Sequence, residues 1–155
     1  MTNIHTLTVL LGRNENQRDT AIAEHVRAVA HSQAASAQAE QLRTYRREYE
    51  QRWNAQFAVE GQIELVHCYH GFMERLTQAL DHQRRVEAHA EGRLERALEL
   101  LRAAELRCAS VRMLIERRTL EQRLVDERRD QKQSDEFAAR VAWNRQGTRG
   151  QPRLG

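Results

Sequence analysis

The sequence has few of the residues that interrupt helices or fill a globular core. Its only proline is Pro152, and it has 7 glycines in 155 residues, so little interrupts a helix before the C-terminal tail. Aromatic residues make up 5% of the chain, while 30% of its residues are charged. This composition argues against a large globular core and is typical of long, solvent-exposed helices.

Cysteine and long apolar segments are also scarce. Cys68 and Cys108 would lie about 60 Å apart on one helix, at ~1.5 Å per residue, and so could not form a disulfide with each other. Two isolated thiols fit a reducing compartment. The apolar run at residues 7–11 is too short and mixed for a signal peptide or a membrane span. We therefore expect a cytoplasmic protein that does not insert into the membrane.

One long apolar stripe dominates what the sequence does contain. From Tyr69 to Val125, alternating steps of four and three residues reach mostly apolar or small side chains over eight heptads. A mean period of 3.5 residues indicates a helix that supercoils around a partner. The stripe is interrupted only by polar residues at Gln83, Glu87, Arg118 and Gln122.

The N-terminal half predicts the partner helix. We expect helices at about residues 5–56 and 63–141, joined by a turn at 57–62 that pivots at Gly61, because glycine frees the backbone to reverse direction. The first helix has a looser register, with apolar or small positions at Ile22, Val26, Val29, Ala34, Ala37, Leu42, Tyr45, Tyr49 and Trp53. The fold class is thus all-α, a long antiparallel two-helix coiled-coil hairpin in which facing residue numbers sum to about 118.

This pairing leaves a C-terminal helical overhang. The first helix ends opposite roughly Ile115, so the apolar residues beyond it have no intramolecular partner: Leu120, Leu124, Val125, Phe137 and Val141. The overhang is either a docking surface or a solvated tail. From Arg112 onward there are eleven basic and seven acidic residues, interleaved rather than segregated. We expect one hairpin domain over residues 1–143 and a disordered tail over 144–155.

No arrangement of residues in the sequence predicts catalysis or a metal site. Glu64-Leu65-Val66-His67 matches one half of a di-metal bundle motif, but no second copy exists. His67, Cys68 and His70 supply at most three ligands, whereas structural zinc takes four. The Arg-rich segment follows the heptads and is mixed with acids, unlike the basic region of a leucine-zipper protein. We expect no enzyme activity, no cofactor, no metal and no nucleic-acid partner.

The order of residues around the expected turn resembles a known family. Tyr45-x-x-x-Tyr49, then Gly61, then Tyr69-x-x-Phe72-x-x-x-Leu76-x-x-Ala79-Leu80-x-x-Gln83, is similar to FliJ, the small coiled-coil protein of the bacterial flagellar export apparatus. The charged ending at residues 127–140 is also similar. The resemblance covers most of the chain, from about Leu7 to Arg140.

The resemblance implies a stalk with several partners. Proteins of that family insert into the export ATPase ring, promote its assembly, contact the export gate membrane protein and escort unloaded export chaperones. They are monomeric when free and lie at the inner face of the cell membrane, where they serve motility and chemotaxis. The residues expected to face the ATPase are Leu7, Leu10, Leu120, Leu124 and Phe137. The export-gate surface would map onto Gln38, Leu42, Tyr45, Tyr49, Phe72, Leu76, Ala79 and Gln83.

Several of these gate residues also face each other in the expected hairpin. We therefore expect Leu42 and Leu76 to be core, and Tyr45, Tyr49 and Phe72 to dock, because two helices cannot bury large aromatic rings fully. Two alternatives to the flagellar stalk stay open. One is the equivalent stalk of a virulence injectisome, and the other is a homodimeric coiled-coil scaffold in which the overhang pairs with a second copy.

Overall fold

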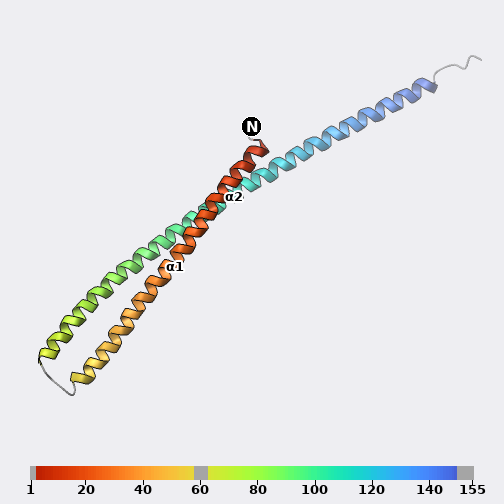
Figure 1. Cartoon of the computed structure of the whole chain (residues 1–155). Helices are drawn as coiled ribbons and strands as arrows, with labels where there is room; N and C mark the ends of the chain where they lie inside the picture. The colour runs from red at the N-terminus through yellow and green to blue at the C-terminus, as the bar shows by residue number, and fades with distance from the viewer. Residues whose placement is uncertain (1–2, 58–62, 150–155) are drawn as a thin grey trace, which may run out of the picture. The chain divides into compact units, whose positions relative to one another are not determined.

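Two long α-helices make up the part of the chain that the structure describes, residues 3–57 and 63–149 of a computed structural model (Figure 1). Helix α1 spans Ile4–Phe57 and helix α2 spans Ile63–Arg149. The two helices pack against each other, and the described residues contain no strand, which confirms the all-α helical hairpin. The expected pivot at Gly61 and most of the turn at 57–62 lie outside the described residues.

The C-terminal end of α2 differs from the expectation. The helix was expected to end near residue 141, but it continues to Arg149, so residues 144–149 are helical rather than disordered. No proline occurs before Pro152, and Gly147 alone costs a helix only ~1 kcal/mol relative to Ala. The Thr148 hydroxyl donates hydrogen bonds to the carbonyls of Asn144 and Arg145, 3.1 and 2.9 Å away. The rest of the expected tail lies outside the described residues.

The described residues form two units, which we treat separately: residues 14–107, and residues 3–13 with 108–149. In the first unit the helix stripes meet along a narrow core of small side chains. The buried apolar residues there are Ala28, Ala35 and Ala39 on α1 and Leu76, Leu80, Ala90 and Ala104 on α2, and Asn14 and Gln83 are buried polar residues. Alanine at these positions lets the two backbones approach closely, which suits a two-helix coil with few large apolar residues.

The α1 register in this unit is stricter than expected, and it follows different residues. Ile22 and Val26 are 40% and 60% exposed, so the stripe drawn through them is wrong. The inward positions instead repeat at strict steps of three and four, and none of them is fully exposed: Ala21, His25, Ala28, Ser32, Ala35, Ala39, Leu42, Arg46, Tyr49 and Trp53. Two helices that pack closely need small side chains between them, so the size of a residue, rather than its hydrophobicity, decides which face of α1 points inward here.

The second unit contains the start of α1 and the end of α2. Leu7 on α1 is 4% exposed, and Cys108 and Val111 on α2 are also buried. The pairing ends at the beginning of α1, where Ile4 lines a shallow hollow with Thr119 and Gln122, and every residue from Thr119 to Arg140 is exposed. The expected C-terminal helical overhang is confirmed.

Candidate docking surfaces

A cluster of six aromatic rings lies at the end of the hairpin nearest the turn. Four rings come from α1, spaced four residues apart and so on one face, and two come from α2: Tyr45, Tyr49, Trp53 and Phe57, with Tyr69 and Phe72. Tyr49 packs on Phe72 with ring centroids 4.1 Å apart. Tyr69 packs on Trp53 and on Phe57, each at 5.4 Å. Facing residue numbers that sum to 118 would pair Tyr49 with Tyr69, so the observed register is shifted from the expected one by about one helical turn.

The residues expected to form an export-gate surface divide by burial. Leu76 and Gln83 are buried, at 6% and 9% exposure. Leu42, Tyr49 and Phe72 are partly buried, while Gln38, Tyr45 and Ala79 are exposed. Gln38, Leu42, Tyr45 and Gln83 line one shallow hollow together with Gln41. A patch with exposed aromatic edges and a hollow beside it is the type of surface that partner proteins contact.

Gln83 occupies a special place in this group. Its side-chain amide donates hydrogen bonds across the hairpin to the backbone carbonyl of Ala35, at 3.0 Å, and to Oε1 of Gln38, at 3.3 Å. One turn further along α2, the Arg43 guanidinium reaches from α1 to Glu87 at 3.3 Å and also to Glu40 at 3.0 Å. The Gln83 hydrogen bonds and the Arg43–Glu87 ion pair join the two helices through polar groups in the middle of the seam.

The residues expected to face an ATPase belong to the other unit. Leu10, Leu120, Leu124 and Phe137 are 40%, 54%, 45% and 70% exposed. Leu7, in contrast, is buried at 4% and belongs to the seam, so it does not offer a free surface. Trp143, which is 76% exposed on the overhang, was not predicted as a contact residue, because the helix was expected to end at residue 141. A tryptophan within a charged segment is the sequence feature that could have indicated it.

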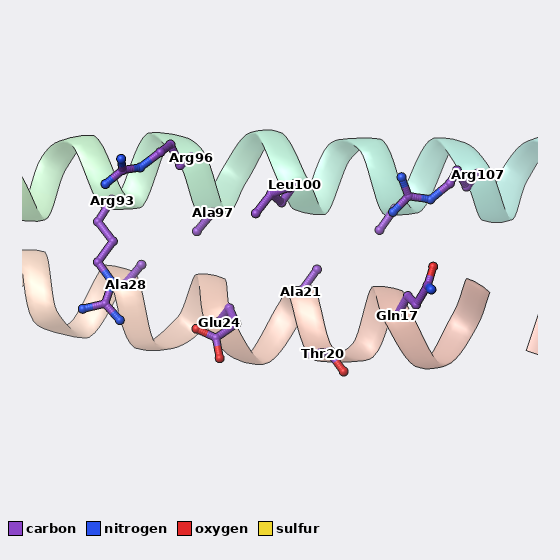
Figure 2. A pocket seen from close by; sticks show the side chains of 11 residues that line it. Gln17, Thr20, Ala21, Glu24, Ala28, Arg93, Arg96, Ala97, Leu100 and Arg107 are labelled. Carbon is purple, nitrogen blue, oxygen red and sulfur yellow. The ribbon is translucent and has the colours of Figure 1, made fainter. Parts of the chain in front are cut away.

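A groove between the helices was not expected from the sequence. It occupies about 790 Å³ in the unit of residues 14–107 (Figure 2). Its floor contains Ala21 and Ala28 of α1 and Ala97 and Ala104 of α2, with the exposed Leu100 beside them. Its remaining lining is polar: Gln17, Thr20 and Glu24 on α1, and Arg93, Arg96 and Arg107 on α2.

The described helices have neither a metal-binding cluster nor a membrane-spanning segment. The described ranges contain no group of three or more His, Cys, Asp or Glu side chains that could hold a metal ion. His67, Cys68 and His70 are all exposed on the surface of α2. Among the described helices, none has a segment apolar and long enough to cross a membrane.

The sequence matches the model of a known protein family. The family model described as "Flagellar FliJ protein" matches residues 3–147, which is nearly the whole chain. The chain belongs to the flagellar FliJ family. Membership implies a role connected with flagellar export, in a family of structural export components rather than enzymes. Comparisons with curated proteins and with solved structures gave no match.

Proposed function

We propose that the chain is a stalk of the flagellar type III export apparatus. It inserts into the export ATPase ring, promotes ring assembly, and couples the ring to the export gate, and it escorts export chaperones in the cytoplasm at the inner face of the membrane. The observation that carries the proposal is the overhang: residues 119–140 are exposed throughout, on a chain of the FliJ family. A single helix without an intramolecular partner has the width to enter a protein ring.

The overhang also has the side chains that such an entry needs. Leu120 and Leu124 are spaced by four residues and so lie on one face, with Phe137 and Trp143 further along the helix. Exposed apolar residues on a charged helix support contact with a partner, because covering them with a partner surface removes apolar area from water and lowers the free energy of the complex. The ATPase-facing assignment therefore rests on Leu10, Leu120, Leu124 and Phe137, with Trp143 added and Leu7 retained only as a support within the seam.

The export-gate assignment rests on the aromatic end of the hairpin. Tyr45 is 45% exposed, and the partly exposed rings of Tyr49 and Phe72 lie next to it. Large aromatic side chains near the centre of a contact supply most of its binding energy in many interfaces. We assign docking to these three rings with Gln38 and Ala79, while Leu42, Leu76 and Gln83 support them from the seam.

The direct test is assembly and ATPase activity of the cognate export ATPase with and without this chain. The full chain should stimulate both, and a version ending after Arg118, which keeps the paired helices, should stimulate neither. Leu120→Asp with Leu124→Asp should reproduce that loss, and Leu106→Asp, at a still more exposed leucine in the other unit, should not. Full stimulation by the version ending after Arg118 would exclude the overhang as the inserted element.

Two alternatives are separated by independent observations. A homodimeric scaffold would sediment as a dimer, and Leu120→Asp would dissociate that dimer into monomers. A stalk would sediment as a monomer. An injectisome stalk would be encoded beside injectisome components. The matched family is a flagellar one, which favours the flagellar system.

A further inference from the structure

The groove of residues 17–28 and 93–107 is unexplained by the stalk proposal. Its eleven lining residues lie outside the aromatic cluster, and none of them is on the overhang. The lining positions recur once per helical turn, from Gln17 to Ala28 on α1 and from Arg93 to Arg107 on α2. The groove therefore follows both helices for three to four turns, about 16–21 Å at ~1.5 Å per residue.

The floor of the groove is shaped for a helix. Four alanines lie along it, and Ala28 and Ala104 are only 4% and 2% exposed. Small side chains leave a channel between two helices into which the ridge of a third helix can pack. Leu100 is 66% exposed at this channel, and Figure 2 shows Leu100 and Ala97 directed toward the space between the helices. An apolar stripe on an incoming helix would cover Leu100.

The charge of the lining selects the kind of helix. Arg93, Arg96 and Arg107 stand along the α2 side, and Figure 2 shows the Arg93 side chain extending across toward α1 beside Ala28. Within the described residues, none of these three guanidinium groups forms an ion pair. Glu24 is the only acidic residue of the lining, and it is already paired with Arg27 at 2.8 Å. The groove thus has an excess of unpaired positive charge next to an apolar floor.

The spacing of the arginines argues against other ligands. Arg93 and Arg107 are separated by about 21 Å along α2, at ~1.5 Å per residue, so they cannot converge on one phosphate or one nucleotide. Nucleic acid would need no apolar floor, because its affinity comes mainly from phosphate contacts. A second copy of this chain is a poor occupant, because its overhang interleaves acids with bases instead of flanking the apolar residues with acids.

We propose that this groove is a docking site for an amphipathic helix of a partner protein, with an apolar stripe of about four turns flanked by Glu and Asp. The apolar stripe packs on the alanine floor and Leu100. The acidic flank that lies beside α2 pairs with Arg93, Arg96 and Arg107. The site is separate from the overhang and from the aromatic cluster, so a partner held here leaves both of those free.

The test uses the full chain and a defined probe. The probe is a fluorescein-labelled, helix-forming 18-residue peptide with leucines at i, i+3, i+4 and i+7 spacing and glutamates on both flanks. A matched peptide has the same leucines with lysine in place of every glutamate. Fluorescence anisotropy should show saturable binding of the glutamate peptide, at least tenfold tighter than the lysine peptide, and weaker at 500 mM than at 50 mM salt.

Two variants and their matched controls locate the site. Arg93→Glu, Arg96→Glu and Arg107→Glu together should weaken binding at least tenfold, while reversal of three exposed arginines outside the groove should change it less than twofold: Arg75, Arg85 and Arg102. Leu100→Asp should weaken binding, and Leu106→Asp should not. All of these side chains are exposed, so the variants should keep the circular dichroism spectrum of the parent.

Each remaining outcome overturns the proposal. No binding of the glutamate peptide, or equal binding of both peptides, excludes an acidic helix as the occupant. Self-association that Leu100→Asp abolishes would assign the groove to a second copy of the chain. Binding to vesicles of anionic phospholipid that the peptide does not compete for would assign the arginines to a membrane surface. None of these readouts involves the export ATPase, so failure here and failure of the stalk proposal are distinguishable.

Discussion

Replacing Gln83 by leucine should raise the stability of the hairpin while loosening its register. The substitution removes hydrogen bonds to the Ala35 carbonyl and to Gln38 Oε1, worth about 1 kcal/mol net. It leaves no buried acceptor unsatisfied, because the Ala35 carbonyl keeps its bond within α1 and Gln38 is exposed to water. A leucine buried at this 9% exposed position contributes about 2 kcal/mol. The net gain in the free energy of unfolding is therefore about 1 kcal/mol.

Thermal unfolding followed by circular dichroism measures the first half of this prediction. A gain of about 1 kcal/mol raises the midpoint by roughly 3 °C in a chain of this length. Gln78→Leu is the matched control, since Gln78 lies on the same helix but is exposed. It should leave the midpoint within about 1 °C, because an exposed leucine removes little apolar surface from water.

The second half concerns which turns of the two helices face each other. Spin labels at the exposed positions Gln33 and Arg85, in a background with Cys68→Ser and Cys108→Ala, report the distance across the seam by pulsed electron resonance. The parent should give one narrow distance. With leucine at position 83 the distribution should broaden, since a slip by one turn moves a label by about 5 Å and no polar group opposes it.

Two results would refute this reasoning. A lower midpoint with an unchanged distance distribution would mean that the Gln83 amide stabilises the seam rather than specifying it. Loss of export-gate binding with both the midpoint and the distances unchanged would mean that Gln83 touches the gate directly, and its burial would then have to be relieved on binding.

Three further predictions follow from the seam and the aromatic cluster. Ala39→Leu should lower stability by about 2 kcal/mol in denaturant unfolding, because Ala39 is 1% exposed in the seam and leaves no room for a larger side chain, whereas Ala37→Leu on the exposed face should be nearly neutral. Tyr49→Ala should cost about 2 kcal/mol and reduce the near-ultraviolet circular dichroism signal, because the ring is partly buried in the aromatic cluster. Arg43→Met should cost at most about 0.5 kcal/mol at low salt and nothing at 0.5 M salt, because the side chain is 41% exposed and its ion pairs are screened.

The second helix could be predicted almost completely from the sequence. Its heptad stripe places Leu76, Leu80, Ala90 and Ala104 inward, and all four are buried. Even the polar interruption at Gln83 was expected, since a polar residue in a heptad seam is a known way to fix register. The prediction succeeded because large apolar residues recur often enough on α2 to determine the period on their own.

The first helix could not be predicted in the same way. Its most apolar residues, Ile22 and Val26, point outward, and its inward stripe is made of alanines with Ser32, His25 and Arg46 between them. Alanine occurs on both faces, so hydrophobicity alone does not identify the seam. The register of α1 depends on which of its faces packs against α2. This is a tertiary effect, and the periodicity of the α1 sequence alone does not reveal it. The groove beside this alanine seam was missed for the same reason.

The proposed gate surface shows why burial and docking need not compete. Leu76 and Gln83 are buried, and Gln83 lines the same hollow as the exposed Gln38 and Tyr45. The packing of Leu76 in the seam keeps the neighbouring turn of α2 in place. The hydrogen bond from Gln83 to the Ala35 carbonyl fixes which turn of α1 lies opposite this part of α2. A shift of one turn, about 5 Å, would separate Tyr49 from Phe72, whose ring centroids are 4.1 Å apart, and would break the aromatic patch. A seam that specifies register is therefore what would keep residues from two helices together as one docking surface.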